Sequence, residues 1–248
     1  MTALARRLGG GLAPGLPRSL LDLAAAWLNA SPLRLPLDRA RHGRLGWYVW
    51  QSRRTLGWTR GAEAVALARH AYALPGSPTV VEVGSFLGCS TVLLAGARKL
   101  RGSGRVHAVD PFDASGDQYS APFYRAIVGL EPGALLERFE ANLRRAGVRA
   151  WVDVHRGRAE EIAAAWSTPV DLLFLDGDQS PAGARTGYLA WAGHLRPGAV
   201  VAVHNSLATE PEHDGSLRLV EDLIRPPAYR DVRLVGSTTF ARRAISDE

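Results

Sequence analysis

The feature that most constrains the fold is an alternation of short apolar, β-branched runs with helical stretches after Thr79. The runs lie at residues 80–83, 106–109, 152–154, 170–175 and 199–203. The helical stretches between several of them are 90–100, 134–146, 159–166 and 182–195. Strands that alternate with helices build βαβ units, whose mostly parallel sheets carry helices on both faces. The sequence therefore predicts an α/β fold.

The two ends of this region depart from the alternation. Residues 61–74 predict a helix before the first strand. Residues 231–245 predict two short strands around a Gly236–Ser237 turn, which is a hairpin and gives the sheet an antiparallel edge. No internal repeat has the period of a solenoid. We expect one domain over residues 61–248, preceded by a segment of different composition.

Residues 1–60 form a basic segment. They hold ten arginines against two acids, Asp22 and Asp38, whereas the rest of the chain has 20 basic and 22 acidic residues. A short helix is predicted over 19–29, and Trp47, Trp50 and Trp58 lie among arginines further on. The segment is a candidate lid, or a dimer contact that would make the protein a homo-oligomer. Tryptophans packed on the edge of the domain and a solvated arginine face explain the same composition.

Composition argues against several classes of protein. No window of about 18 uninterrupted apolar residues occurs, so we expect no stable membrane insertion. Cys89 is the only cysteine, which excludes an intrachain disulfide framework and suits a reducing cytoplasm. No small-residue cleavage site follows the N-terminal apolar run cleanly, so a signal peptide is not expected. Because the basic excess is confined to residues 1–60, we expect no nucleic-acid partner.

The most informative stretch is VVEVGSFLGCSTVLLA, residues 80–95. A strand ends in Glu82–Val83–Gly84, and a helix begins near Ser90. Gly84 permits a tight turn, and Gly88 lets a ligand approach the backbone. The amides at the start of the helix favour a carboxylate or a phosphate, and Ser90 adds a hydroxyl. The loop lacks the middle glycine of the dinucleotide fingerprint, which argues against a bound pyrophosphate.

The next strand ends in VHAVDPF, which places Asp110 at the same edge of the sheet. In open parallel sheets the ligand binds beyond the carboxyl ends of the strands. A carboxylate there can accept both hydroxyls of a ribose. A nucleoside with a small zwitterionic tail would satisfy both loops.

In combination these motifs resemble a known family. The pattern E-x-G-x-x-x-G-x-S, then A-V-D-P-F, L-D-G-D and H-N, is similar to the class I S-adenosylmethionine-dependent methyltransferases over about residues 60–245. More narrowly, it resembles the metal-dependent O-methyltransferases related to catechol O-methyltransferase and their natural-product branch, which includes macrocin O-methyltransferase. The resemblance implies a Rossmann-like, doubly wound sheet of seven strands, mostly parallel with an antiparallel C-terminal hairpin.

The resemblance also assigns cofactor contacts. It implies that one loop holds the methionine moiety of S-adenosylmethionine, with contacts from Glu82, Gly84, Ser85, Gly88 and Ser90. Asp110 would hold the ribose, and Arg158–Ala159 would flank the adenine. Asp176 would lie beside the sulfonium.

Two further strand ends are expected to meet at this edge. Asp176 ends one of them, and His204 with Asn205 ends the next. Relatives place three metal ligands at the matching positions, so the resemblance implies Mg²⁺ or a similar divalent ion held by Asp176, His204 and Asn205. Asp178 is an accessory ligand or a helix cap. The plain alternative is that all these side chains cap strands and helices beside the cofactor.

Gln179 is where the sequence departs from its nearer relatives, which keep a histidine there. An amide takes up no proton near neutral pH, so the base must come from elsewhere. The candidates are His204, if it is not a ligand, and His213 in the loop EPEHDG. The predicted catalytic residues are thus Asp176, His204 and His213.

The predicted function is methyl transfer from S-adenosylmethionine to a hydroxyl of a small metabolite, as in natural-product biosynthesis, with help from a divalent metal. Residues 38–60, 111–133 and 206–215 are predicted to shape the acceptor pocket. Two alternatives stay open: a metal-independent methyltransferase, and a non-catalytic protein that binds S-adenosylmethionine. Gln179 and Asn205 are the residues that favour the last.

Overall fold

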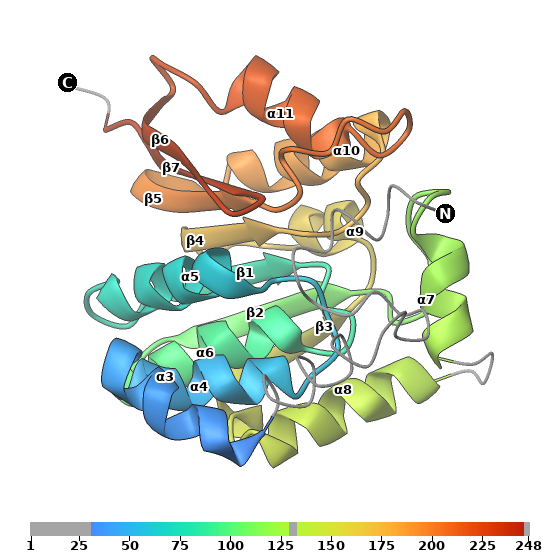
Figure 1. The fold of residues 1–248 in the computed structure, drawn as a ribbon. Coiled ribbons are helices and arrows are strands. Elements are labelled where there is room, and N and C mark those ends of the chain that lie inside the picture. The colour runs from blue at the N-terminus through green and yellow to red at the C-terminus, as the bar shows by residue number, and fades with distance from the viewer. Residues whose placement is uncertain (1–30, 129–132, 246–248) are drawn as a thin grey trace.

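A computed structural model describes residues 31–128 and 133–245 of the chain (Figure 1). The predicted helix over 19–29 lies outside these residues. Seven strands form one sheet in the order β3-β2-β1-β4-β5-β7-β6. Neighbours among the first five strands are parallel, and β7 is antiparallel to both β5 and β6. The strands are β1 Thr79–Val83, β2 Arg105–Asp110, β3 Val152–Arg156, β4 Val170–Leu175, β5 Leu195–Val203, β6 Tyr229–Val235 and β7 Thr238–Arg243. The predicted Rossmann-like sheet with its C-terminal hairpin is confirmed.

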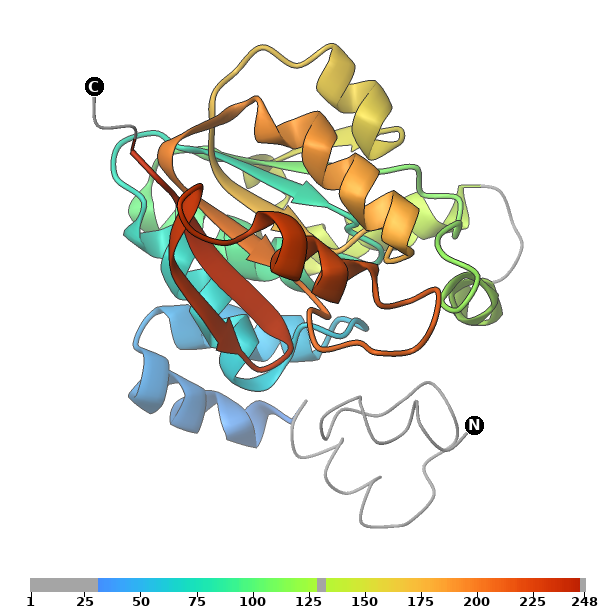
Figure 2. The same cartoon turned by 90° about the horizontal axis from the view of Figure 1, so that it is seen from above.

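Helices cover both faces of the sheet (Figure 2). One face packs against α4, α5, α6 and α8, and the other against α9, α10 and α11. The bounds are α3 Leu35–His42, α4 Leu45–Arg53, α5 Gly61–Ala73, α6 Cys89–Arg101, α7 Ala121–Val128, α8 Ala134–Arg145, α9 Ala159–Ala164, α10 Pro181–Ala192 and α11 Gly215–Leu223, with short 3₁₀ turns at Pro32–Arg34 and Arg149–Trp151. Among the described residues, no helix combines the length and the apolar character that a membrane span needs.

The alternation of side chains along β4 shows why both faces must be covered. Leu172 and Phe174 belong to one core cluster, whereas Leu173 and Leu175 belong to the other. Successive residues of a strand point to opposite faces, so a wholly apolar run requires apolar neighbours on both sides.

Some predicted boundaries shift for local reasons. The helix predicted over 182–195 ends at Ala192, and β5 already begins at Leu195, earlier than the predicted 199. Ser180 caps the start of α10 by accepting a hydrogen bond from the amide of Gly183, and Pro181 occupies its first turn. Helices α3, α4, α7 and α11 were not predicted. The last two follow β2 and β5 only after the loops 111–120 and 204–214.

The described part of the basic segment packs against the domain. Tyr48, Val49 and Trp50 of α4 are buried, and the indole of Trp50 donates a hydrogen bond to the carbonyl of Ser31 over 2.9 Å. In α6, a β-carbon built on Gly96 would lie 2.1 Å from Cγ of Tyr48, so only glycine lets the ring pack this closely. The role of the segment as a lid or an oligomer contact stays a prediction.

Replacing Gly96 with alanine should lower the free energy of unfolding by about 2 kcal/mol, because the new methyl group overpacks the contact with Tyr48. Urea denaturation measures the change. The matched control is Gly187→Ala in α10, where the nearest atom to the new β-carbon is 3.9 Å away. The control should gain up to about 1 kcal/mol from helix propensity. Equal stability of the two variants would contradict this packing of α4 on α6.

Candidate active site

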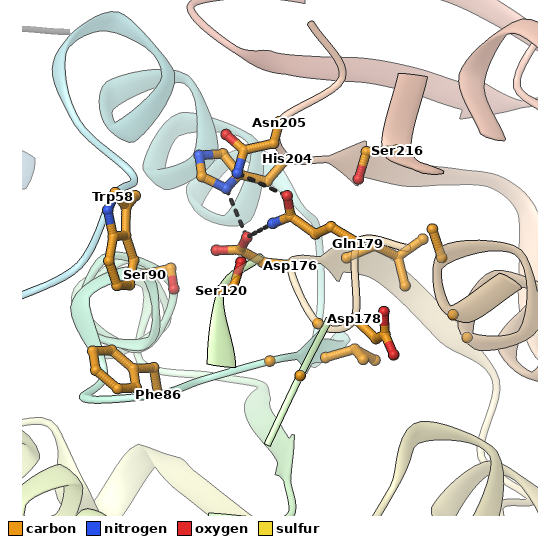
Figure 3. A pocket seen from close by; sticks show the side chains of 18 of the residues that line it. Trp58, Phe86, Ser90, Ser120, Asp176, Asp178, Gln179, His204, Asn205 and Ser216 are labelled. Atoms are coloured by element: carbon orange, nitrogen blue, oxygen red, sulfur yellow. Dashed lines mark hydrogen bonds and ion pairs between the residues drawn. The ribbon is translucent and has the colours of Figure 1, made fainter. Parts of the chain in front are cut away.

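A cavity of about 840 Å³ opens at the carboxyl ends of the parallel strands. Its walls come from the loops that follow β1, β2, β3, β4 and β5, and from residues 56–63, which lead into α5 and include its first turn. This is the edge at which open parallel sheets bind their ligands, and the volume lies in the range of cofactor and small-molecule sites. Figure 3 shows the side chains that gather there.

Most of the predicted cofactor residues border this cavity. They are Gly84, Ser85, Ser90, Asp110, Arg158, Ala159 and Asp176. Glu82 and Gly88, which the sequence also assigned to the cofactor, are absent from its lining. The difference arises because the loop between β1 and α6 presents one side to the cavity and packs its other side into the protein.

Asp110 organises the first loop. One carboxylate oxygen accepts hydrogen bonds from the amides of Ser85 and Phe86 at 2.8 and 2.9 Å, and the other accepts from the amide of Phe112 at 2.7 Å. Burial raises the pKa of Asp110 above its usual range, although these amides oppose the rise. Three of the roughly four lone-pair sites of the carboxylate are used, and the remaining one, on Oδ1, lets Asp110 hold the loop and still accept a hydroxyl.

Glu82 supports the loop from behind instead of facing the cavity. Its side chain is fully buried, and Oε2 accepts hydrogen bonds from the hydroxyls of Ser85 and Thr91. Burial raises the pKa of Glu82 to about 7. The predicted direct contact of Glu82 with the cofactor is therefore replaced by an indirect role, through Ser85.

The two glycines of this loop also serve packing. A β-carbon on Gly84 would lie 2.3 Å from the carbonyl oxygen of Asp176, and one on Gly88 would lie 3.1 Å from the ring of Phe139. Both residues have positive φ, 84° and 89°, which disfavours other side chains. Gly88 was predicted to admit a ligand, whereas the structure turns it toward Phe139.

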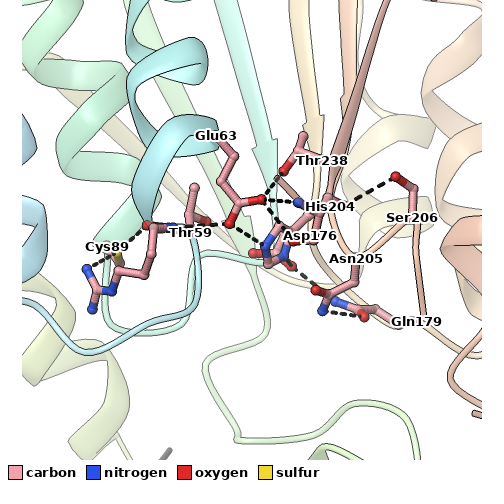
Figure 4. Close-up of polar contacts among 11 residues, drawn as sticks. Thr59, Glu63, Cys89, Asp176, Gln179, His204, Asn205, Ser206 and Thr238 are labelled. Carbon is pink, nitrogen blue, oxygen red and sulfur yellow. Dashed lines mark hydrogen bonds and ion pairs between the residues drawn. The ribbon is translucent and has the colours of Figure 1, made fainter. Parts of the chain in front are cut away.

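His204 lies in a buried polar chain between two carboxylates (Figure 4). Its Nδ1 is 2.7 Å from Oδ1 of Asp176, and its Nε2 is 3.5 Å from Oε1 of Glu63. Burial alone would lower the pKa of His204, but the charges and hydrogen bonds of Asp176 and Glu63 raise it to about 10. Both ring nitrogens therefore lie opposite a carboxylate oxygen, an arrangement that favours the protonated ring over a free base.

Glu63 holds the other end of this chain. It accepts hydrogen bonds from the backbone amide and hydroxyl of Ser237 at 2.7 and 2.8 Å, and from the amide of Arg60 at 3.1 Å. Burial would raise the pKa of Glu63, but His204 and these amides lower it to about 2. Glu63 thereby joins the start of α5 to the turn between β6 and β7 and to the end of β5.

Gln179 extends the chain on the side of Asp176. Its Nε2 donates to Oδ1 of Asp176 over 3.1 Å, and its Oε1 accepts from Nδ2 of Asn205 over 2.9 Å. Asp178 points elsewhere, because its Oδ1 accepts from the amide of Ser180 at the start of α10 (Figure 3). Asp178 thus closes a turn just before Ser180, the N-cap of α10, which favours the structural role over that of an accessory ligand.

These hydrogen bonds do not fit the predicted metal site. Oδ1 of Asp176 already accepts from His204 and Gln179, and the amide nitrogen of Asn205 is bonded to Gln179. His204 directs Nδ1 at Asp176 and Nε2 at Glu63, so binding of a metal ion by its ring would replace one of these contacts. Among residues 31–128 and 133–245, no group of three or more His, Cys, Asp or Glu side chains could hold a metal ion. The roles of His204 as a ligand and as a base stay predictions, and the structure shows one contact of this ring that the sequence did not predict, with Glu63.

His213, the other predicted base, lies in the cavity wall. Its Nδ1 is 3.2 Å from Oδ1 of Asp117, and the ring of Tyr119 packs on it with centroids 4.6 Å apart. Burial would raise the pKa of Asp117, but its hydrogen bond to His213 and the charge of that ring lower it. A carboxylate that engages Nδ1 orients the ring and leaves Nε2 for proton exchange.

Two residues of this site escaped the sequence analysis. Glu63 occupies the third position of α5, where an acid after a turn signals a capping box, and its second role depends on the distant hairpin. Asp117 closes the turn just before α7 by accepting from the amides of Tyr119 and Ser120, which is a signal that the sequence DQYS carries. In both cases the local signal predicts a cap and cannot reveal the histidine partner.

Aromatic rings form one wall of the cavity. Trp58, Phe86 and Tyr124 contact one another, with centroids 5.0–5.5 Å apart. Trp58 comes from the basic segment, and Tyr124 from α7. Parts of all three regions predicted to shape the acceptor pocket therefore border the cavity.

Comparisons with known proteins agree with this geometry. A family model described as "Methyltransferase domain" matches residues 81–206. The cofactor-bound Rv0187 from MTB is similar in structure, with a TM-score of 0.59 at 20% identity over 94% of this chain and 99% of that chain. The O-methyltransferase TomG from Streptomyces achromogenes, involved in tomaymycin synthesis and solved with SAM, gives 0.54 at 23% identity over 82% and 90%. The O-methyltransferase NovP gives 0.59 at 14% identity over 73% and 79%. At these identities the solved structures support the fold.

Proposed function

Because the chain belongs to the methyltransferase-domain family, we propose that it transfers the methyl group of S-adenosylmethionine to a hydroxyl oxygen of a small metabolite. One observation carries the proposal. The predicted cofactor residues Ser85, Asp110 and Arg158 share a cavity with the Asp117–His213 pair. A cofactor on one side would then face an acceptor whose proton His213 can take.

Each part of the cofactor has a chemically suitable neighbour. The amides of Cys89 and Ser90 suit its carboxylate, since they lie in the first turn of α6, where a helix favours anions. Asp110 suits the ribose hydroxyls, and Arg158–Ala159 border the end of the cavity that would hold the adenine. The carboxylate of Asp176 would favour the positive sulfonium.

The reaction is a direct displacement at the methyl carbon. A bond forms between the acceptor oxygen and this carbon while the carbon–sulfur bond breaks, and its electron pair leaves on the sulfur. The hydroxyl proton passes to Nε2 of His213, and the carboxylate of Asp117 stabilises the imidazolium that forms. Alignment of the two reacting groups in the cavity supplies much of the rate.

The metal-assisted form of this reaction, expected from the sequence, would use a divalent ion to acidify the acceptor hydroxyl. Because the residues at Asp176, His204 and Asn205 do not fit such an ion, no step above depends on it. The proposal places the enzyme in the cytoplasm and in natural-product biosynthesis, with a small hydroxylated acceptor. It also includes a homo-oligomer contact in residues 1–60. No nucleic-acid or membrane partner is expected.

The test is a transfer assay with S-adenosylmethionine labelled in its methyl group. The purified protein is incubated with a panel of phenols, enols and aliphatic alcohols, and each product is analysed by mass spectrometry and NMR. The label should appear on an oxygen of at least one acceptor. Binding of the cofactor without transfer to any acceptor would favour the non-catalytic alternative, and label on nitrogen would overturn the O-methyl assignment.

Replacing His213 with alanine should lower kcat by about 100-fold or more, because the acceptor loses its general base. The dissociation constant for S-adenosylmethionine should stay within about twofold, since His213 belongs to the acceptor side. The matched control is His194→Ala, whose Nε2 faces the carbonyl of Ala163 at 3.2 Å, outside the cavity lining. Equal losses in the two variants, or an unchanged kcat without His213, would exclude His213 as the base.

A further inference from the structure

The carboxamide of Gln179 lies between Asp176 and Asn205, where the sequence led us to expect a metal ion (Figure 3). It donates to the carboxylate over 3.1 Å and accepts from the amide of Asn205 over 2.9 Å. A metal ion would join the same two side chains by attracting an oxygen of each. A carboxamide joins them in another way, because it carries a donor and an acceptor on one planar group.

The main chain fixes the carboxamide in this position. Gln179 is only 3% exposed, and its carbonyl accepts a hydrogen bond from the amide of Gly215 over 3.0 Å. A β-carbon on Gly215 would lie 2.2 Å from the carbonyl oxygen of Ser180, so α11 begins in close contact with this turn. These contacts hold the backbone of Gln179 in place, and its carboxamide is positioned by its two hydrogen bonds to Asp176 and Asn205.

His204 separates the two carboxylates of this site. Its ring nitrogens face carboxylate oxygens, with Nδ1 at 2.7 Å from Asp176 and Nε2 at 3.5 Å from Glu63. Because the ring stands between them, the two carboxylates do not converge on one point, as the ligands of a hard dication must. Among the described residues, no group of three or more His, Cys, Asp or Glu side chains could hold a metal ion.

We infer that the Gln179 carboxamide replaces the divalent metal as the link between Asp176 and Asn205, so that this site is assembled without a metal ion. The inference deepens the proposed function and rests on it for the assignment of this site to methyl transfer. The structural claim can be tested separately, because it concerns only which group joins Asp176 to Asn205. The link keeps Asp176 facing the cavity. The proton of the acceptor hydroxyl is then removed by His213, in place of acidification by a metal.

The test measures Mn²⁺ binding to the full chain by isothermal titration calorimetry and electron paramagnetic resonance, with no cofactor or acceptor present. The wild-type protein should bind no stoichiometric Mn²⁺ at submillimolar concentrations. Gln179→Glu keeps the length of the side chain and adds a carboxylate beside Asp176, so it should gain one Mn²⁺ with affinity raised about 10-fold or more. Gln179→Met, similar in size and without a donor or strong acceptor, is the control and should gain none.

Two results would overturn the inference. The first is one equivalent of Mn²⁺ on the wild-type protein that Asn205→Ala abolishes. The second is a folded Gln179→Glu variant, judged by its thermal unfolding, that gains no Mn²⁺, because the carboxamide would then not be what excludes the ion. Titration of wild-type protein with S-adenosylmethionine in a chelator separates the two proposals. If the protein binds no S-adenosylmethionine in this titration, the proposed function is overturned. The Mn²⁺ measurements would still decide whether the carboxamide excludes a metal ion.

Discussion

Replacing Glu63 with alanine is expected to lower the free energy of unfolding by about 3 kcal/mol or more. The change removes one partner of a buried ion pair, and such losses typically reach this size because the other charge stays buried. It also deprives the amides of Arg60 and Ser237 of their acceptor. Urea denaturation at neutral pH measures the loss.

The control for this variant is Glu137→Ala. Glu137 is also an acid in the first turn of a helix, but it is exposed. Its removal should cost no more than about 1 kcal/mol, which is the usual range for an acid near a helix start. Losses of equal size in the two variants would mean that Glu63 acts only as a helix cap, and that its contact with His204 adds nothing.

The same buried chain sets a dependence of stability on pH. The pKa of His204 is raised from 6.5 to about 10, so the native state holds a proton that the unfolded chain releases, and this stabilisation is lost as pH rises from 6.5 toward 10. The pKa of Glu63 is lowered from 4.5 to about 2, so its contribution is lost as pH falls from 4.5 toward 2. In Glu63→Ala the alkaline loss should be smaller, because one of the two carboxylates that hold the proton is gone.

Replacing Asp110 with alanine is expected to weaken the binding of S-adenosylmethionine by about 100-fold or more. Three backbone amides lose a charged acceptor, and hydrogen bonds to charged groups are worth about 1.5–3 kcal/mol each. The loop at Ser85 and Phe86 would lose its anchor, and the ribose would lose its proposed partner. Calorimetric titration of the cofactor measures the change.

Asp113→Ala is the matched control for Asp110→Ala. Asp113 lies three residues further along the chain, is exposed, and accepts a hydrogen bond from the amide of Ser115 at 2.8 Å. It does not border the cavity. Its loss should change cofactor affinity by less than about threefold. A normal affinity in Asp110→Ala would contradict both the anchoring role of Asp110 and its place at the ribose.

The sequence predicted the sheet well because its signal is local. In a run such as Val170–Leu175 every position except Asp171 is apolar, and only a strand covered on both faces buries it. Helix α7 was missed because it lies within the long connection between β2 and α8, and no strand follows it before α8. The extension of β5 back to Leu195 depends on its partner Val170 across a register shift, which no local pattern reveals.

The cavity wall was predicted in part for the same reason. Ser85, Asp110 and Asp176 stand at strand ends, and parallel topology brings strand ends together. The chemistry at His204 was not predictable, because its second carboxylate, Glu63, comes from a helix 141 positions earlier in the chain (204 − 63). The sequence could identify Gln179 as unusual, but its function as a link required the positions of Asp176 and Asn205 in space.

The central claim is that this cavity moves a methyl group to a hydroxyl oxygen with a histidine as the base and without a metal ion. The most direct test compares transfer of labelled methyl from S-adenosylmethionine to an accepted hydroxyl compound in a chelating buffer and in one with added Mg²⁺. We predict O-methylated product at equal rates in the two buffers. Product that forms only with Mg²⁺, or label that never leaves the cofactor in either buffer, would contradict the account.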